Sequence, residues 1–212
     1  MKLSLQNGGE NVRVWKAIDV AARGGRMAQA KSISERIAID AYLAGENDGS
    51  LRHEFVDGRI FAMAGASERH NTVKLNIASP LHASIEEPCR VFDGDMKLRV
   101  DQGEDVRFYY PDIFVSRASE SADDYVRRDA VLIIEIISPS TERTDRYEKF
   151  SAYVGLPMLS EYALVEQGTP SVELYRRRTG WQLEHFGPGA SVTFESISQT
   201  LTMDQIYKRI KF

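Results

Sequence analysis

The fold is decided by an apolar run that contains a single acid, Val131-Leu132-Ile133-Ile134-Glu135-Ile136-Ile137, and is followed directly by the turn-forming Ser138-Pro139-Ser140-Thr141. A short run rich in β-branched residues that ends at a Ser/Pro cluster predicts a strand buried on both faces. An isolated carboxylate in such a strand would cost several kcal/mol or take up a proton. We therefore expect Glu135 to have a partner, which is a metal ion, a lysine or arginine, or a second acid that shares a proton.

A second acid, Asp112, lies upstream between Tyr110-Pro111 and the apolar Ile113-Phe114-Val115. Pro-Asp is common where a loop enters a strand, so turn chemistry alone would explain an isolated pair of this kind. Here, however, Asp112 would open one strand while Glu135 stands near the end of the next. Because sequential strands are usually neighbours, the two carboxylates can converge on one divalent cation.

A short helix is predicted over residues 144–153, after the Ser/Pro turn. Four of its residues share one face at helical spacing: Arg146, Lys149, Phe150 and Tyr153. That face would place Lys149 beside aromatic packing residues and favours a role in the site. The alternative is that Asp145 and Lys149 form an ordinary i,i+4 ion pair on an exposed helix.

Taken in order, these motifs resemble the Uma-two family of restriction-endonuclease-like proteins, a branch of the PD-(D/E)XK nuclease superfamily. The resemblance also includes three stretches of the N-terminal half and runs from about residue 32 to the C-terminus. The three stretches are Arg52-His53-Glu54-Phe55-Val56-Asp57-Gly58-Arg59-Ile60, Met63-Ala64-Gly65-Ala66-Ser67 with His70-Asn71, and Asp95-Met96-Lys97-Leu98-Arg99-Val100. A string of ordered motifs is far more specific than any one of them.

The resemblance implies an α/β (α+β) fold, a restriction-endonuclease-like mixed β-sheet flanked by helices. Asp112 would fill the PD position and Glu135 the (D/E) position, and both would bind Mg²⁺ or Mn²⁺ together with the backbone carbonyl of Ile136. The superfamily lysine two residues after Glu135 is replaced by Ile137. The matching basic residue is Lys149 on the following helix. Glu54 resembles an acid that many members place near the first helix, although its stretch also predicts an ordinary strand before an Asp-Gly turn.

The activity implied is that of a metal-dependent endonuclease, in which a metal-activated water hydrolyses phosphodiester bonds in DNA. Asp112, Glu135 and Lys149 would be the catalytic residues, with Lys149 orienting the water or offsetting the charge on the phosphate. The alternative function is that of a catalytically inactive nuclease-fold protein acting as a nucleic-acid-binding or regulatory module. A homodimer would suit a nuclease that cuts both strands.

Several other polar residues have an ordinary explanation beside a functional one. His70 precedes a helical stretch and could contact a phosphate or simply lie on the surface. Asp95 and Lys97 alternate with apolar residues, which predicts that they share one face of a strand. Arg127-Arg128 and Arg176-Arg177-Arg178 could grip a nucleic-acid backbone or be solvated charges near turns.

Composition indicates one globular domain. The chain has 212 residues, of which 42% are hydrophobic and 27% charged, and its net charge of −4 argues against broad nonspecific nucleic-acid binding without excluding a local groove. Cys89 is the single cysteine, which excludes a disulfide framework and fits a cytoplasmic location. No segment is apolar enough to span a bilayer, and we expect no membrane partner. Residues 1–30 are predicted to be a poorly ordered appendage, with translation beginning at Met27, and residues 31–212 to be a single domain.

Patterns along the chain predict the remaining elements. Helices are expected from Ile33 with Ser34 as its cap, over residues 71–86 and over residues 202–210. Strands are expected on both sides of Asp57-Gly58 and over residues 90–100, 107–115, 131–137, 161–165, 171–177 and 180–186.

Overall fold

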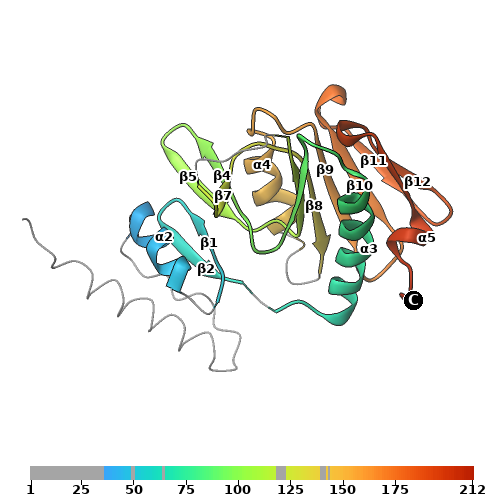
Figure 1. Cartoon of the computed structure of the whole chain (residues 1–212), viewed down its shortest axis with the longest axis horizontal. Helices are drawn as coiled ribbons and strands as arrows, with labels where there is room; N and C mark the ends of the chain where they lie inside the picture. The colour runs from blue at the N-terminus through green and yellow to red at the C-terminus, as the bar shows by residue number, and fades with distance from the viewer. Residues whose placement is uncertain (1–35, 49–50, 64, 118–122, 139–141, 143) are drawn as a thin grey trace, which may run out of the picture. The chain divides into compact units, whose positions relative to one another are not determined.

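The structure is a computed structural model that describes residues 36–48, 51–63, 65–117, 123–138, 142 and 144–212 (Figure 1). Its contacts divide the chain into two compact units, which we treat separately. The first takes residues up to Ala64 together with Asp105–Phe108, and the second takes Gly65–Glu104 together with Tyr109–Phe212. The appendage over residues 1–30 and the start at Met27 lie outside the described residues. That residues 31–212 form a single domain stays a prediction.

The first unit is a helix packed with a hairpin and one further strand. Helix α2 (Ile39–Asp48) precedes β1 (His53–Val56) and β2 (Arg59–Ala62), and β1 also pairs antiparallel with β5 (Asp105–Tyr109). The predicted Asp57-Gly58 turn is confirmed, because both residues have positive φ, as a two-residue hairpin loop requires. The core of the unit is formed by the rings of Tyr42, Phe55 and Phe108.

The helix that was predicted to begin at Ile33 does not include residues 36–38, the first residues that the structure describes. Residues 36–38 are not helical, and the amide of Ile37 donates instead to the carbonyl of Gly58 at 2.8 Å. Because this amide is committed to the hairpin turn, helical hydrogen bonding begins only at Ile39. The proposed cap, Ser34, lies outside the described residues.

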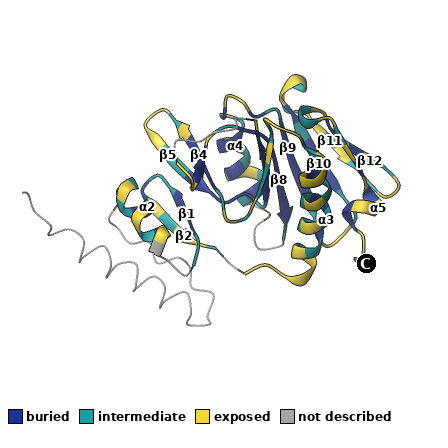
Figure 2. Cartoon of the chain, in the orientation of Figure 1, coloured by how far each residue is buried: buried dark blue, intermediate teal, exposed yellow. Residues whose placement is uncertain are grey.

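The second unit is built on a six-stranded mixed sheet in the order β11-β10-β9-β8-β6-β3. Its strands are β3 (Arg90–Asp93), β6 (Ile113–Ser116), β8 (Ala130–Ile137), β9 (Glu161–Glu166), β10 (Val172–Arg176) and β11 (Leu183–Phe186). β8 and β9 are parallel, and the other pairs are antiparallel. Every residue of β8 is buried, as predicted from its apolar run, and Figure 2 shows this strand dark along its length.

The two faces of this sheet are covered by different helices, which explains why β8 is buried on both. Helix α3 (Glu68–Ser84) packs its apolar residues on one face, against Ile134 and Ile136. The other face carries Glu135, and it is covered by the π-helical turn η1 (Thr144–Lys149) and by α4 (Phe150–Tyr153). Side chains alternate along a strand, so Glu135 points away from α3.

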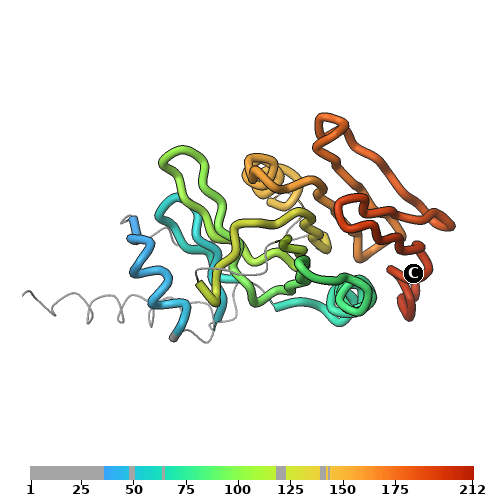
Figure 3. Tube along the Cα trace, turned by 45° about the horizontal axis from the view of Figure 1, so that its top comes forward, coloured from blue at the N-terminus to red at the C-terminus, as the bar shows by residue number. Residues whose placement is uncertain are grey.

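The remaining elements of the second unit are short. They are β4 (Lys97–Gln102) paired in parallel with β7 (Val126–Arg127), the hairpin of β12 (Ser191–Phe194) and β13 (Gln199–Thr202), the turns η2 (Arg177–Thr179) and η3 (Glu195–Ile197), and α5 (Met203–Ile206). Figure 3 shows the C-terminal segment beside α3. Among the described residues, no helix is long and apolar enough to cross a membrane.

Mixed sheets flanked by helices confirm the predicted fold class, but several boundaries were wrong. Helix α3 begins at Glu68, because Ser67 caps it by accepting the amide of His70. Residues 90–100 are divided between two strands by a turn, and residues 107–115 are divided by the irregular residues 110–112. Asp95 lies in the turn and therefore does not share a strand face with Lys97. The C-terminal helix ends at Ile206, and the β12–β13 hairpin was not predicted.

Candidate active site

Asp112 and Glu135 lie side by side where β6 begins and β8 ends. The two strands pair antiparallel with Ile113 opposite Ile134, which brings the start of one beside the end of the other. The amide of Asp112 donates to Oε2 of Glu135 at 3.1 Å, and the amide of Ile136 donates to Oδ2 of Asp112 at 2.8 Å. Each carboxylate therefore binds the backbone of the other's segment, which fixes both side chains.

Glu135 has the partner that its burial required. Its side chain is 3% exposed, and its Oε1 lies 3.2 Å from Nζ of Lys149 and accepts the hydroxyl of Tyr153 at 3.0 Å. Of the three partners predicted from the sequence, the structure shows the lysine. An ion pair supplemented by hydrogen bonds offsets much of the cost of burying a carboxylate.

The turn that carries Lys149 brings in a further acid, Asp145. Lys149 Nζ is also 3.2 Å from Oδ1 of Asp145, and both side chains are less than a tenth exposed. The alternative of an exposed i,i+4 pair is therefore wrong, since the ion pair exists but is buried. Sequence reasoning missed Asp145 as a site residue, because its spacing to Lys149 is the one found on any solvated helix.

The predicted common face of the helix is also wrong. Lys149 and Tyr153 turn toward Glu135, whereas Arg146 contacts Glu142, Glu166 and Glu173 instead. Phe150 packs on another aromatic cluster. The reason is the π-helical turn, whose i to i+5 hydrogen bonding changes the angle between successive side chains.

His70 joins the site from the first turn of α3. Its Nε2 lies 3.1 Å from Oδ2 of Asp112, and its side chain is 13% exposed. The capped start of α3 at Ser67 places His70 here. Of the two explanations given by the sequence, the surface histidine is wrong, and no contact with a carboxylate was foreseen.

Four side chains of the site carry three carboxylates and one ammonium. Glu135 and Asp145 both contact the ammonium of Lys149, and Asp112 lies beside Glu135. Burial raises the pKa of Tyr162 well above its ordinary value, and the charges of Glu135 and Asp145 raise this pKa further. An excess of buried negative charge is a setting that a divalent cation would neutralise.

The open side of the acid pair carries oxygen donors that suit a hard cation. Asp112 is bonded through Oδ2, no residue in the described part of the chain donates to its Oδ1, and its side chain is 21% exposed. The Ile136 carbonyl leaves β8 on the same side as its amide, toward Asp112. Mg²⁺ keeps several waters and commonly uses only one or two carboxylates, so this set fits it.

Side chains alone do not form a metal cage. Within the described ranges, no three His, Cys, Asp or Glu side chains are grouped so that they could hold a metal ion. A Mg²⁺ site here would therefore consist of two carboxylates, a backbone carbonyl and waters. The assignment of Asp112, Glu135 and Ile136 as ligands stays a prediction.

Comparisons with known proteins identify the family of this chain. The model of the Uma2 family, described as "Putative restriction endonuclease", matches residues 39–204. The chain belongs to the Uma2 family. The uncharacterized protein slr1290 of Synechocystis sp. is 26% identical over 185 residues, which cover 84% of this chain and 94% of that protein. The uncharacterized protein sll1609 of the same organism is 31% identical over 160 residues, which cover 72% of this chain and 89% of that protein. The resemblance found in the sequence motifs is therefore confirmed.

A solved structure shares the fold. The crystal structure of "a putative nuclease belonging to DUF820" from Anabaena variabilis aligns with a TM-score of 0.60 and 19% identity, over 74% of this chain and 90% of that one. At this identity the comparison supports the fold rather than the chemistry. Together with the Uma2 match, it confirms a nuclease-type fold for this chain.

Three other polar residues singled out in the sequence have the following surroundings. Glu54 lies on β1 in the first unit, opposite Phe61, and its role as a ligand stays a prediction. Arg127 is held by Asp129 and Ser116. Lys97 is buried, with its ammonium 5.7 Å from the centre of the Tyr110 ring.

The arginine run after β10 is mostly structural. Arg176 is 4% exposed and bonds Glu161 and Glu184, so neither the solvated nor the phosphate-gripping explanation holds for it. Arg177 donates to the carbonyls of Leu159 and Leu156.

Proposed function

We propose that this member of the Uma2 family is a metal-dependent endonuclease that hydrolyses phosphodiester bonds in DNA. The observation that carries the proposal is the pairing of Asp112 with Glu135 at adjoining strand ends, with Lys149 held against Glu135. The family description and the nuclease-type fold support the same reaction class. Two oxygen-donor carboxylates beside a buried cation suit phosphodiester hydrolysis.

Each residue of the site has a distinct task in this proposal. Asp112, Glu135 and the Ile136 carbonyl would hold Mg²⁺ or Mn²⁺, which when bound supplies an activated water and charge to stabilise the transition state. His70 contacts Oδ2 of Asp112, so Oδ1 is left for a metal ion. Lys149 fixes Oε1 of Glu135 and places positive charge where the phosphate becomes more negative.

One observation favours a second candidate, a nuclease-fold protein that binds nucleic acid or regulates without cutting. The Oε1 atom of Glu135 is bonded by Lys149 and Tyr153, so the buried acid is compensated without any metal. A non-catalytic protein could retain such an arrangement for its structure alone.

Plasmid cleavage separates the two functions. With Mg²⁺ or Mn²⁺ present, the wild type should cut supercoiled DNA, and Asp112→Asn should reduce cutting by about 100-fold or more because a charged ligand becomes a neutral amide. The matched control is Asp93→Asn, since Asp93 is 59% exposed and its Lys74 contact is 3.8 Å long. Unchanged cutting by Asp112→Asn would exclude this site. A wild type that binds DNA without cutting it under any of these conditions would favour the non-catalytic function.

A further inference from the structure

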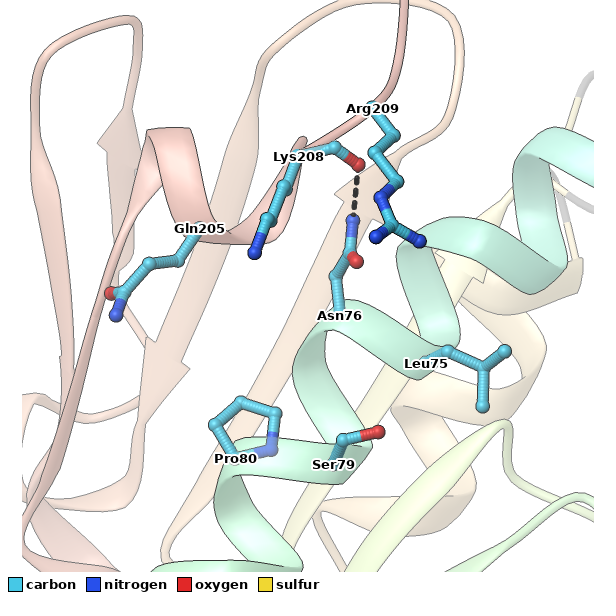
Figure 4. Close-up of a pocket in the computed structure, with 7 residues that line it drawn as sticks. All are labelled: Leu75, Asn76, Ser79, Pro80, Gln205, Lys208 and Arg209. Carbon is cyan, nitrogen blue, oxygen red and sulfur yellow. Dashed lines mark hydrogen bonds between the residues drawn. The ribbon is translucent and has the colours of Figure 1, made fainter.

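A pocket of about 420 Å³ lies between α3 and the segment that follows α5. α3 contributes Asn76 and Ser79, among others, α5 contributes Gln205, and the segment after α5 contributes Lys208 and Arg209. Figure 4 shows the amino group of Lys208 and the guanidinium of Arg209 extending toward α3 on either side of Asn76. The pocket is therefore lined by cations and by side chains able to donate hydrogen bonds.

The wall that carries the cations is fastened to α3. The Asn76 side-chain amide donates to the carbonyls of Ile206 and Lys208, at 3.0 and 2.8 Å. Arg209 has a φ of 67°, a left-handed conformation in which glycine would avoid the strain of a side chain. The backbone at Lys208 and Arg209 is thus held in a defined place, and both side chains are exposed.

No carboxylate lines the pocket, and within the described residues neither Lys208 nor Arg209 forms a salt bridge. Arg176, by contrast, is neutralised by acids. Arg69 extends the same cationic surface, because it donates to the carbonyl of Lys211 beside the pocket wall. In a chain of net charge −4, this is a local surface suited to an anion.

We propose that this pocket, lined by Asn76, Ser79, Gln205, Lys208 and Arg209, binds a phosphate of a nucleic-acid backbone. The identification of the anion as nucleic acid rests on the proposed function. The acids around Glu135 repel a polyanion, so a DNA substrate needs cations elsewhere on the same unit.

Helix α3 links the two places on this unit. It carries His70 at the candidate active site and Ser79 at the pocket, about 13 Å apart along its axis. That distance corresponds to about four base-pair steps of a DNA duplex. A duplex therefore spans the axial separation, but nine residues make about two and a half helical turns, so the two side chains leave α3 on opposite sides and a nucleic acid bound at both places must pass around the helix.

The test is DNA binding without cleavage. Fluorescence anisotropy of a labelled 20-base-pair duplex is measured in EDTA, at several salt concentrations, for the wild type and for Lys208→Gln/Arg209→Gly. The glycine suits the left-handed conformation, so this variant keeps the fold, which thermal unfolding checks. Its matched control is Arg90→Gln/Arg99→Gln, which removes two cations that already have acidic partners.

We expect the pocket variant to bind DNA about tenfold more weakly than the wild type. The slope of the logarithm of the binding constant against the logarithm of salt concentration should be reduced by between about one and two. The control should change the DNA affinity by less than about twofold. Equal affinity of the two double variants would overturn the proposal. Calorimetry with inorganic phosphate distinguishes a free-anion site, and phosphate binding that the pocket variant loses while DNA binding is unchanged would also overturn it. EDTA prevents metal-dependent cutting, so this binding measurement does not depend on cleavage. A wild type that cuts no DNA when Mg²⁺ is present would contradict the proposed function separately.

Discussion

Replacing Lys149 by methionine should destabilise the protein strongly while leaving its metal affinity intact. Lys149 is 3.2 Å from both Glu135 and Asp145, and all three side chains are less than a tenth exposed. Removing one partner of a buried ion pair costs about 3–5 kcal/mol, because the remaining charge is left uncompensated. Methionine fills most of the lysine volume, so little of this cost comes from a cavity. In a protein of this size the cost corresponds to a fall in Tm of about 10 °C.

Divalent metal should restore part of this stability. A cation bound by Asp112 and Glu135 replaces some of the lost positive charge, and a ligand at 100 times its Kd stabilises the folded state by about 2.7 kcal/mol. The assay is denaturant unfolding of Lys149→Met with and without Mg²⁺. Lys74→Met is the control, because Lys74 meets an exposed Asp93 at 3.8 Å and should cost less than about 1 kcal/mol. Equal stability of the two variants would refute the reasoning, and loss of the Mg²⁺ effect in Lys149→Met would show that Lys149 is needed for metal binding.

Three further outcomes are expected. The pKa of Tyr162 is raised by burial and then by nearby charges. Folding stability should therefore fall as pH rises above about 10, because the tyrosine ionises there in the unfolded state and not in the folded one. Unfolding titrations at pH 8 and 11 should show a smaller fall for Tyr162→Phe. Arg176→Ala should cost about 3–5 kcal/mol because it leaves buried Glu161 without its ion-pair partner, whereas Arg178→Ala removes an exposed arginine and should cost far less, as chemical denaturation can measure; similar values for both would contradict the buried network. His70→Ala should weaken Mn²⁺ binding by about 10- to 100-fold because Asp112 loses its orienting partner, and unaltered calorimetric affinity would exclude that role.

The centre of the fold could be predicted because its sequence signals are local. The apolar run around Glu135 has one structural solution, a strand buried on both faces, and the Asp57-Gly58 pair has one preferred turn. Asp112 and Glu135 could be placed together because sequential strands tend to be neighbours.

The errors occurred where tertiary contacts override local patterns. Nothing in the spacing of Asp145 and Lys149 distinguishes a buried ion pair from a solvated one, since burial depends on β8 and α4 packing around them. Arg176 looked like part of a surface charge run, but its acid partners come from β9 and β11. The β12–β13 hairpin was missed although Val192 alternates with exposed neighbours, because the strand is only four residues long.

The most direct test of the account is calorimetric titration of Mn²⁺ into the wild type and into Glu135→Gln, with plasmid cleavage measured on the same samples. The account predicts that the wild type binds the metal and cuts DNA, and that Glu135→Gln does neither while still folding, since glutamine keeps the core volume and Lys149 keeps Asp145 as its partner. Equal Mn²⁺ affinity and equal cleavage by the two proteins would contradict a metal nuclease centred on Glu135.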